Sequence, residues 1–277
     1  MDEIISAIRR RLADGQPAAY VRILSARGST PREEGAFMLV TPSAQAGTIG
    51  GGRLEWDCVA EARALLAADG PAVECEIALG PEIGQCCGGA VRVRIERATP
   101  ALLDIVAHEV AAVRAAWPPL LLFGAGHVGR ALARALAPLP LRLVWIDPRA
   151  GEFGTIPDGV EARISDDWES AIAAAPPGAG VLVLTPSHAL DALIVAAALE
   201  RGDFRYVGLI GSKTKRRRFE AGFRALGLAE DRIATLVCPV GDRGVRDKRP
   251  EIIATLVAAE IVETLLQDRP VGDGRTC

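Results

Sequence analysis

Aromatic residues and long apolar runs are scarce in this chain of 277 residues. Phe, Trp and Tyr make up only 4% of it, whereas hydrophobic residues make up 49%, so we expect cores of aliphatic strands and alanine-rich helices. Pro, Gly or a charged residue interrupts every apolar stretch well before the roughly 18 residues that a membrane-spanning helix needs. Residues 1–4 lack the basic start and apolar run of a signal peptide. The sequence therefore predicts a cytoplasmic protein with no membrane partner.

An excess of positive charge and a metal-binding cysteine pattern are also missing. The formal net charge is -3, which argues against a nucleic-acid partner because proteins that bind nucleic acid normally carry a strongly basic face. The six cysteines include no CxxC pair and no zinc-ligand spacing, and a reducing cytosol would keep them as thiols. We therefore expect neither a nucleic-acid partner nor a structural zinc ion.

The chain is longer than one typical domain of roughly 100 to 200 residues, so two domains are expected. Residues 1–117 have the pattern of a small N-terminal α+β domain that contains Gly-rich and Cys-Cys loops. Its helices are expected at 4–13, 54–68 and 100–116, and its strands at 18–24, 37–41, 73–79 and 90–95. Pro118 and Pro119 end the last helix, which places the domain boundary there.

Apolar strands alternate with helices after residue 117. Strands are expected at 120–123, 141–146, 181–184, 206–210 and 233–237, and helices at 127–137, 167–175, 189–201, 213–226 and 248–266. Nearly continuous apolar strands separated by helices indicate a parallel sheet covered on both faces. Residues 118–267 are thus predicted to form a Rossmann-like domain, followed by a flexible tail at 268–277. The fold class is α/β, a doubly wound parallel sheet domain preceded by a smaller α+β domain.

A glycine motif, Gly124-Ala125-Gly126-His127-Val128-Gly129, follows the first of these later strands and opens a helix. The first glycine permits a tight turn, the second lets a phosphate approach the backbone, and the third allows close helix packing. Asp147 ends the next strand, where NAD-binding proteins hold a ribose hydroxyl. The candidate ligand-binding residues here are Gly124, Gly126, His127, Gly129 and Asp147. The alternative is that the glycines serve strand–helix packing alone.

Polar residues also follow the strand expected at 181–184. Thr185, Ser187 and His188 should face the same crevice as Gly126, because ligands bind at the carboxyl ends of the strands in an open parallel sheet. His188 is a candidate donor of a hydrogen bond or a proton. The alternative is that Ser187 or His188 merely caps the next helix.

The segment after strand 206–210 places Ser212 and Lys213 at the start of a helix. Ser212 is expected as the N-cap, and a cation next to it is locally unfavourable, by about 0.3 to 1 kcal/mol, because the amino end of a helix is positive. An anionic ligand nearby would offset that cost, so Lys213 and Lys215 are candidate phosphate contacts. Residues 216–218 are interpreted as a solvated basic surface.

Two adjacent cysteines, Cys86 and Cys87, are framed by glycines in the segment Gly84-Gln85-Cys86-Cys87-Gly88-Gly89. Neighbouring cysteines form a disulfide only with a strained ring, and backbone N–H groups of a glycine-rich turn favour the thiolate. A thiolate can carry sulfur, act as a nucleophile or bind a soft metal. The alternative is that both are small residues of a tight turn, with one of them buried as a hydrophobe.

A second glycine cluster consists of Gly50, Gly51 and Gly52, followed by Arg53. Successive backbone N–H groups can form a nest for an anion, which Arg53 would help to hold. The alternative is a plain turn. Together with segment 29–32 and the cysteine loop, this cluster gives the first domain three polar loops that could meet at one site.

These motifs, taken in order, resemble those of the XdhC/CoxI family, the xanthine dehydrogenase accessory proteins. The resemblance extends from about residue 18 to 266 and is carried by Gly47-Thr48-Ile49-Gly50-Gly51-Gly52-Arg53-Leu54-Glu55, Gly84-Gln85-Cys86-Cys87-Gly88-Gly89, Phe123-Gly124-Ala125-Gly126-His127-Val128-Gly129, Tyr206-Val207-Gly208-Leu209-Ile210-Gly211-Ser212-Lys213 and Cys238-Pro239-Val240-Gly241. One departure is Pro186, where relatives often carry a histidine, so no paired-histidine role is expected.

The resemblance implies a chaperone for the molybdenum cofactor in its molybdopterin form, and not an enzyme. Such a protein holds the cofactor while a cysteine desulfurase supplies the terminal sulfido ligand, and then inserts it into the molybdenum subunit of apo xanthine dehydrogenase. The cofactor's phosphate suits the glycine nests and Lys213, and its soft molybdenum–sulfur centre suits Cys86 or Cys87. A homodimer is expected as well, because pairing would add core to the small first domain.

The rival interpretation is an NAD(P)-dependent oxidoreductase. The complete glycine motif and Asp147 support it, and His188 could act as its acid or base. It leaves Cys86, Cys87 and the cluster at 50–52 without a role.

Overall fold

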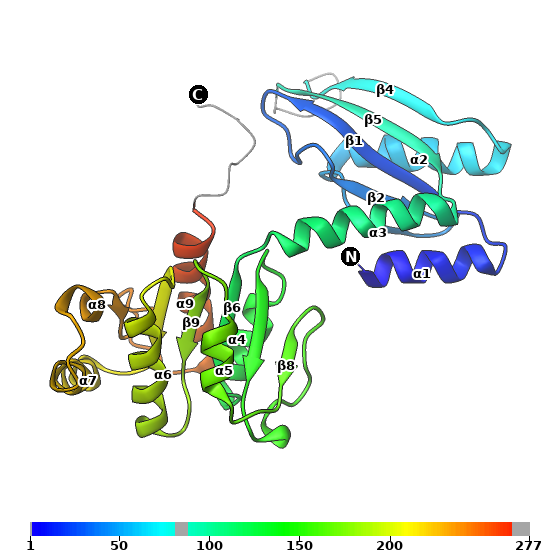
Figure 1. Ribbon diagram of the computed structural model, residues 1–277. Helices are drawn as coiled ribbons and strands as arrows, with labels where there is room; N and C mark the ends of the chain where they lie inside the picture. Colours follow the sequence, from blue (N-terminus) through cyan, green and yellow to red (C-terminus); the bar gives the residue numbers. More distant parts are fainter. Residues whose placement is uncertain (1, 81–87, 268–277) are drawn as a thin grey trace. The chain divides into compact units, whose positions relative to one another are not determined.

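The protein is described by a computed structural model covering residues 2–80 and 88–267 (Figure 1). The chain forms two compact units, the first ending at Ala112 and the second beginning at Val113. The division falls within helix α3 (Pro100–Ala115), a few residues before the paired prolines. Cys86, Cys87 and the predicted tail at 268–277 lie outside the described residues.

The first unit is an antiparallel sheet with helices on both faces. Its strands lie in the order β3-β2-β1-β5-β4, and each pairs antiparallel with its neighbours. Besides α3, its elements are α1 (Asp2–Ala13), β1 (Ala19–Arg27), β2 (Phe37–Val40), β3 (Gln45–Gly47), α2 (Gly52–Ala68), β4 (Val73–Ala78) and β5 (Ala90–Arg97). β4 and β5 pair on either side of the cysteine loop, as the sequence predicted for a hairpin connection.

The alternation of side chains along β1 divides this unit into two cores. Val21 and Ile23 point toward α2 and pack with Leu54 in one apolar cluster. Tyr20 points the other way and packs with Leu103 of α3 and with residues of α1. Because successive strand residues face opposite sides of a sheet, one strand anchors both layers of helices.

The second unit is a parallel sheet whose strands run in the order β11-β10-β9-β6-β7-β8. Its elements are β6 (Pro119–Phe123), α4 (His127–Leu136), β7 (Arg142–Ile146), the short 3-10 helix η2 (Ala150–Glu152), β8 (Glu161–Arg163), α5 (Trp168–Ala174), β9 (Gly180–Val183), α6 (His188–Arg201), β10 (Tyr206–Leu209), α7 (Lys213–Ala225), α8 (Glu230–Ala234), β11 (Leu236–Val237) and α9 (Pro250–Leu265). Numbered by appearance, the strands have the 3-2-1-4-5-6 order of dinucleotide-binding folds.

Both faces of this sheet are covered, which confirms the predicted Rossmann-like fold (Figure 1). Leu120 and Leu122 of β6 pack with α4 and α9, whereas Leu121 and Phe123 pack with α5, α6 and α7. Strand order reverses between β6 and β9, so the loops that follow these two strands border the crevice in which such folds bind ligands.

Two parts of the second unit differ from the sequence prediction. Ile233, expected in a strand, lies in α8, where Glu230 and Asp231 occupy the first turn and interact favourably with the helix dipole. The strand β8 was not predicted, because its three residues are mostly exposed and carry two charges, as edge strands often do. Within the described ranges, no helix is long and apolar enough to span a bilayer.

Candidate functional site

In the glycine motif after β6, close packing requires glycine at two positions, whereas the third has space for a side chain. A Cβ on Gly124 would lie 2.4 Å from the Leu184 carbonyl oxygen, and one on Gly129 would lie 2.1 Å from the Gly124 oxygen. Gly124 also has a φ of +115°. Gly126 has φ -66° and no atom within 4 Å of its Cβ position. Packing therefore accounts for the first and third glycines, whereas Gly126 leaves room for a ligand.

Asp147, at the end of β7, is buried and fully engaged by the protein itself. Its Oδ2 accepts a hydrogen bond of 2.8 Å from the Ala125 N–H, and its Oδ1 accepts one of 2.9 Å from the Arg149 N–H. The Arg149 guanidinium binds both oxygens, at 2.9 and 2.8 Å. Burial by itself would raise the pKa of Asp147, but the hydrogen bonds from Arg149 and Ala125 prevail and lower it. The carboxylate thus holds the glycine loop in place.

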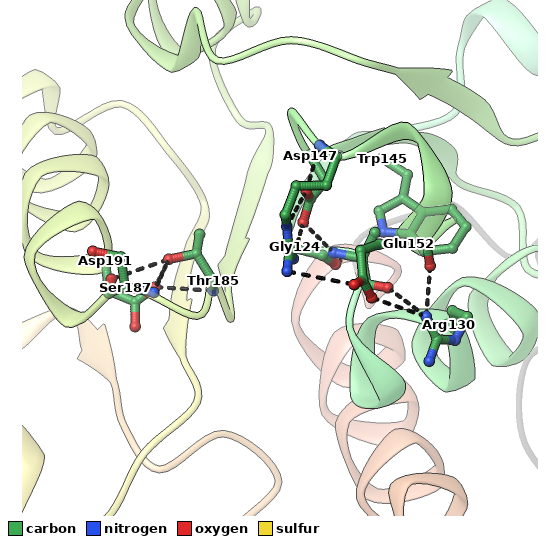
Figure 2. Close-up of polar contacts among 10 residues, drawn as sticks. Gly124, Arg130, Trp145, Asp147, Glu152, Thr185, Ser187 and Asp191 are labelled. Atoms are coloured by element: carbon green, nitrogen blue, oxygen red, sulfur yellow. Dashed lines mark hydrogen bonds and ion pairs between the residues drawn. The ribbon is translucent and has the colours of Figure 1, made fainter. Parts of the chain in front are cut away.

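A cluster of charged side chains supports this loop from the side (Figure 2). The Arg130 Nη1 donates to the Ala125 carbonyl at 3.1 Å and to the Glu152 carbonyl at 2.6 Å. The Glu152 carboxylate pairs with Arg130 and, at 3.7 Å, with Arg149. The Trp145 Nε1 donates to the Gly124 carbonyl at 2.9 Å. Together these contacts fix the backbone of the motif before any ligand binds.

A second polar network holds the loop after β9, shown beside the first in Figure 2. The Asp191 Oδ1 accepts hydrogen bonds from the Thr185 N–H at 3.0 Å and the Thr185 hydroxyl at 2.8 Å. Its Oδ2 pairs with the Lys215 Nζ at 2.8 Å, and that ammonium also donates to the Ile210 carbonyl at 3.0 Å. Asp191 is completely buried. Lys215 is therefore used inside the fold, which leaves Lys213 as the exposed lysine of the two.

The remaining predicted residues of the second unit lie at the surface. His127 begins α4 and His188 begins α6, and both are exposed. Ser187 caps α6 by accepting a hydrogen bond of 3.3 Å from the Leu190 N–H. Ser212 caps α7 in the same way, as the sequence predicted, with the Lys215 N–H at 3.1 Å. Their hydroxyls therefore have a structural task, whether or not they also contact a ligand.

The predicted nest at 50–52 already holds an anion, and that anion is the side chain of Glu55. Its Oε2 accepts hydrogen bonds of 3.1 Å from the N–H groups of both Ile49 and Gly51, together with one from the Thr48 hydroxyl. Burial would raise the pKa of Glu55, but these hydrogen bonds lower it. Arg53 pairs with Asp57 through both carboxylate oxygens at 2.8 Å.

The described parts of the three polar loops of the first unit lie next to one another. A Cβ on Gly89 would lie 2.3 Å from the Ser29 carbonyl oxygen, so segment 28–30 passes directly beside the end of the cysteine loop. A Cβ on Gly50 would lie 2.5 Å from the Pro31 Cγ, so the next residue along the chain contacts the glycine cluster. Segment 28–32 thus connects the other two loops.

The three described thiols lack the solvent exposure and lowered pKa of reactive cysteines. Cys58 and Cys238 are buried, and Cys75 is partly buried. Burial raises the pKa of Cys58 to about 12, and it also raises the pKa values of Cys75 and Cys238. In the described part of the chain, no three His, Cys, Asp or Glu side chains gather in a way that could hold a metal ion.

Sequence reasoning missed the partners that occupy these sites. Arg149 and Glu55 lie only two and four residues from Asp147 and Gly51, so their spacing could have suggested the contacts. The pair of Asp191 and Lys215 had no local signal, because the two residues are 24 positions apart.

Comparisons with known proteins follow this division into two units. A family described as "XdhC Rossmann domain" matches residues 120–261, and the "XdhC and CoxI family" matches residues 11–75. The uncharacterized protein YqeB of Escherichia coli K12 is 30% identical over 257 residues, which cover 89% of this chain and 43% of YqeB. The chain therefore spans less than half the length of that relative.

A solved structure supports the fold independently. The crystal structure described as a xanthine dehydrogenase from Bacillus halodurans has a TM-score of 0.74 to this chain and covers 97% of both chains. At 19% sequence identity, this similarity shows a common fold.

Proposed function

This chain belongs to the XdhC and CoxI family, and we propose on that basis that it is an accessory protein in the maturation of a xanthine dehydrogenase. In this role it prepares another protein for catalysis and does not itself turn over substrate. The observation that carries the proposal is the family match over residues 120–261, joined by the match over 11–75.

The molybdenum cofactor is the cargo in this proposal. The chain holds the molybdopterin form while a cysteine desulfurase provides the terminal sulfido ligand, and then delivers it to the molybdenum subunit of apo xanthine dehydrogenase. The cargo offers a phosphate, which backbone N–H groups and cations bind, and a soft metal centre, which thiolates bind. This chain contains glycine-rich segments and cations that could bind the phosphate, and cysteines that could bind the metal centre.

The open position at Gly126 supports binding of an anionic group at the crevice of the second unit, because no side chain blocks the approach to its backbone. The adjoining loops of the first unit support a site near the cysteines. The residues proposed to bind the cargo are Gly50, Gly51, Gly52, Arg53, Cys86, Cys87, Gly124, Gly126, His127, Gly129, Asp147, His188, Ser212 and Lys213. Among them, Gly124, Gly129 and Asp147 would act by positioning the loop, given the contacts that they already make, and Gly51, whose N–H already binds Glu55, would likewise act by positioning its own loop.

Purification under anaerobic conditions from cells that make the cofactor tests this proposal. The bound molybdenum and the pterin fluorescence should both be stoichiometric with the chain, and incubation with apo xanthine dehydrogenase should transfer them. Absence of pterin under every condition, combined with tight stoichiometric NAD and substrate turnover, would overturn the proposal.

The cysteine loop has its own variants. Cys86→Ala or Cys87→Ala should weaken retention of the sulfurated cofactor and leave the fold intact. Cys75→Ala is the matched control, since this thiol lies on the strand that leads toward the same loop and is partly buried. If both variants retain and transfer cofactor as well as the control does, the loop has a structural role only.

The NAD(P)-dependent oxidoreductase is the second candidate, and the 3-2-1-4-5-6 strand order favours it. The state of Asp147 counts against it, because both carboxylate oxygens already bind Arg149 and the loop, and a ribose diol would have to displace them. Titration of the purified chain with NAD and NADP should therefore give no tight binding.

A further inference from the structure

A pocket of about 480 Å³ lies within the second unit, beside the first turns of α7. Segment 237–239 forms one wall of it. The charged side chains that line it are Lys213, Arg216, Arg217, Glu220, Asp242 and Glu260. Its volume is in the range of small-molecule sites, which are typically about 300 to 1,000 Å³.

Two of the three acidic side chains of this pocket, Glu220 and Glu260, are committed to partners within the protein. Glu220 pairs with Arg216 at 2.7 Å. Glu260 accepts hydrogen bonds from the Tyr206 hydroxyl at 2.6 Å and from the Gly241 N–H at 2.9 Å. These contacts satisfy the two carboxylates and reduce their effect on the rest of the pocket.

Two of the cations remain available. Arg217 has neither a hydrogen bond nor an ion pair with any residue in 2–80 or 88–267. Lys213 has only a loose contact of 3.7 Å with Asp242, and its side chain is 80% exposed. Such exposed pairs contribute little to stability. The pocket therefore presents two positive groups that the fold does not need.

The sequence around the pocket is also rich in positive charge. Residues 213–249 contain eleven Lys or Arg and five Asp or Glu, a formal charge of +6 in a chain whose net charge is -3. Several of these cations fall in the first turn of α7, where the helix dipole disfavours positive charge. Asp191 compensates Lys215 there, whereas Lys213 has only its loose contact with Asp242, and an anion in the pocket would offset the cost of its position.

We propose that this pocket binds the phosphate group of a small ligand, with Arg217 and Lys213 as its direct contacts. Arg217 offers several N–H donors in a planar fork that matches phosphate oxygens, and Lys213 adds a compact charge. The phosphate of the proposed cargo is one source of this phosphate group, so the site deepens the proposed function. Only the identity of the ligand rests on that function.

Inorganic pyrophosphate is the probe, and calorimetric titration of the purified full chain is the measurement. Arg217→Ala should raise the dissociation constant about tenfold or more, as expected for loss of a charge-assisted hydrogen bond. Arg218→Ala is the matched control, because Arg218 is the adjacent exposed residue, carries the same charge and does not line the pocket. It should change the dissociation constant by less than about twofold. Lys213→Ala should also weaken binding.

Equal losses in Arg217→Ala and Arg218→Ala would overturn the proposal, since a diffuse charge effect would then explain binding. Absence of saturable binding to the unaltered chain would overturn it too. A second arm identifies the source of the phosphate. If Arg217→Ala reduces retention of molybdopterin in the anaerobic assay, the cargo supplies the phosphate. If only pyrophosphate binding falls, the pocket stands as a site for another phosphate ester.

Discussion

The Lys215 ammonium lies 2.8 Å from the Asp191 carboxylate, and neither group is well exposed to water, since the Lys215 side chain is 14% accessible and that of Asp191 is 0%. The same carboxylate binds the backbone and hydroxyl of Thr185. One buried acid therefore ties together α6, α7 and the loop after β9.

Replacement of Asp191 should destabilise the second unit strongly. Asp191→Ala leaves the Lys215 charge buried and the Thr185 N–H without its acceptor, and loss of one partner of a buried pair typically costs about 3 to 5 kcal/mol. Urea denaturation followed by circular dichroism measures the change. Glu230→Ala, which removes an exposed partner of Arg224 and an acidic residue of the first turn of α8, is the control and should lower the midpoint far less. Similar midpoints for both variants would contradict the role assigned to Asp191.

Stability should depend on the ionisation of Asp147 in acid. Its folded pKa is lowered from 3.8, so its contribution is fully present above pH 3.8 and is lost as the pH falls through the folded value. Asp147→Asn should therefore be less stable than the unaltered chain at pH 7, and the difference should shrink below about pH 3.8. Urea midpoints across this range provide the test, and a difference that stays constant with pH would contradict it.

The fold of the second unit was predictable because its signals are local. Each apolar strand and amphipathic helix can be identified within a window of about a dozen residues, and Gly124 marks the turn between β6 and α4. The exceptions are β8, which depends on edge pairing with β7, and Ile233, which lies in a helix of only five residues, too short for a periodic pattern. Local patterns carry little information about either.

The glycines of the motif should separate folding from binding. Gly129→Ala places a methyl group 2.1 Å from the Gly124 oxygen, and this backbone clash should cost a few kcal/mol of stability. Gly126→Ala meets no atom within 4 Å at an ordinary φ, so the fold should persist. Thermal denaturation and cofactor retention, measured on both variants, are the tests. Unchanged cofactor retention in a stable Gly126→Ala variant would show that no ligand approaches there.

The candidate site was harder to predict than the fold, because side chains of the protein itself occupy its expected contacts. Asp147 and the nest at 50–52 have the right residue types for a ribose or a phosphate. Arg149 and Glu55 engage those groups through contacts that depend on side-chain direction. A motif indicates which contacts its residues can make with a ligand. Only the folded structure shows whether another side chain of the protein already makes those contacts.

Glu55 should matter for the stability of the first unit. Glu55→Ala removes the acceptor of the Ile49 and Gly51 N–H groups, with an expected loss of about 1 kcal/mol because water can partly replace it. Asp57→Ala, which removes only the exposed partner of Arg53, should have a smaller effect. Urea midpoints of the two variants are the measurement. A loss of stability in Asp57→Ala as large as that in Glu55→Ala would contradict the prediction.

Thiol labelling should distinguish the cysteines in the native chain. With a pKa of about 12 and a buried side chain, Cys58 should resist a maleimide at pH 7, and the buried Cys238 should do the same. Peptide mass spectrometry after labelling identifies the modified sites. Rapid modification of Cys58 in the folded chain would contradict its placement in the core of the first unit.

Steric crowding around Gly124 and Gly129 has an evolutionary consequence. These two glycines are retained by the geometry of strand and helix, so they would survive in a lineage that had stopped binding nucleotides altogether. A search for the motif would group such a lineage with active dehydrogenases. Packing does not require glycine at position 126. Substitution by larger residues there, with Gly124 and Gly129 unchanged, would therefore indicate that a lineage has lost the ligand.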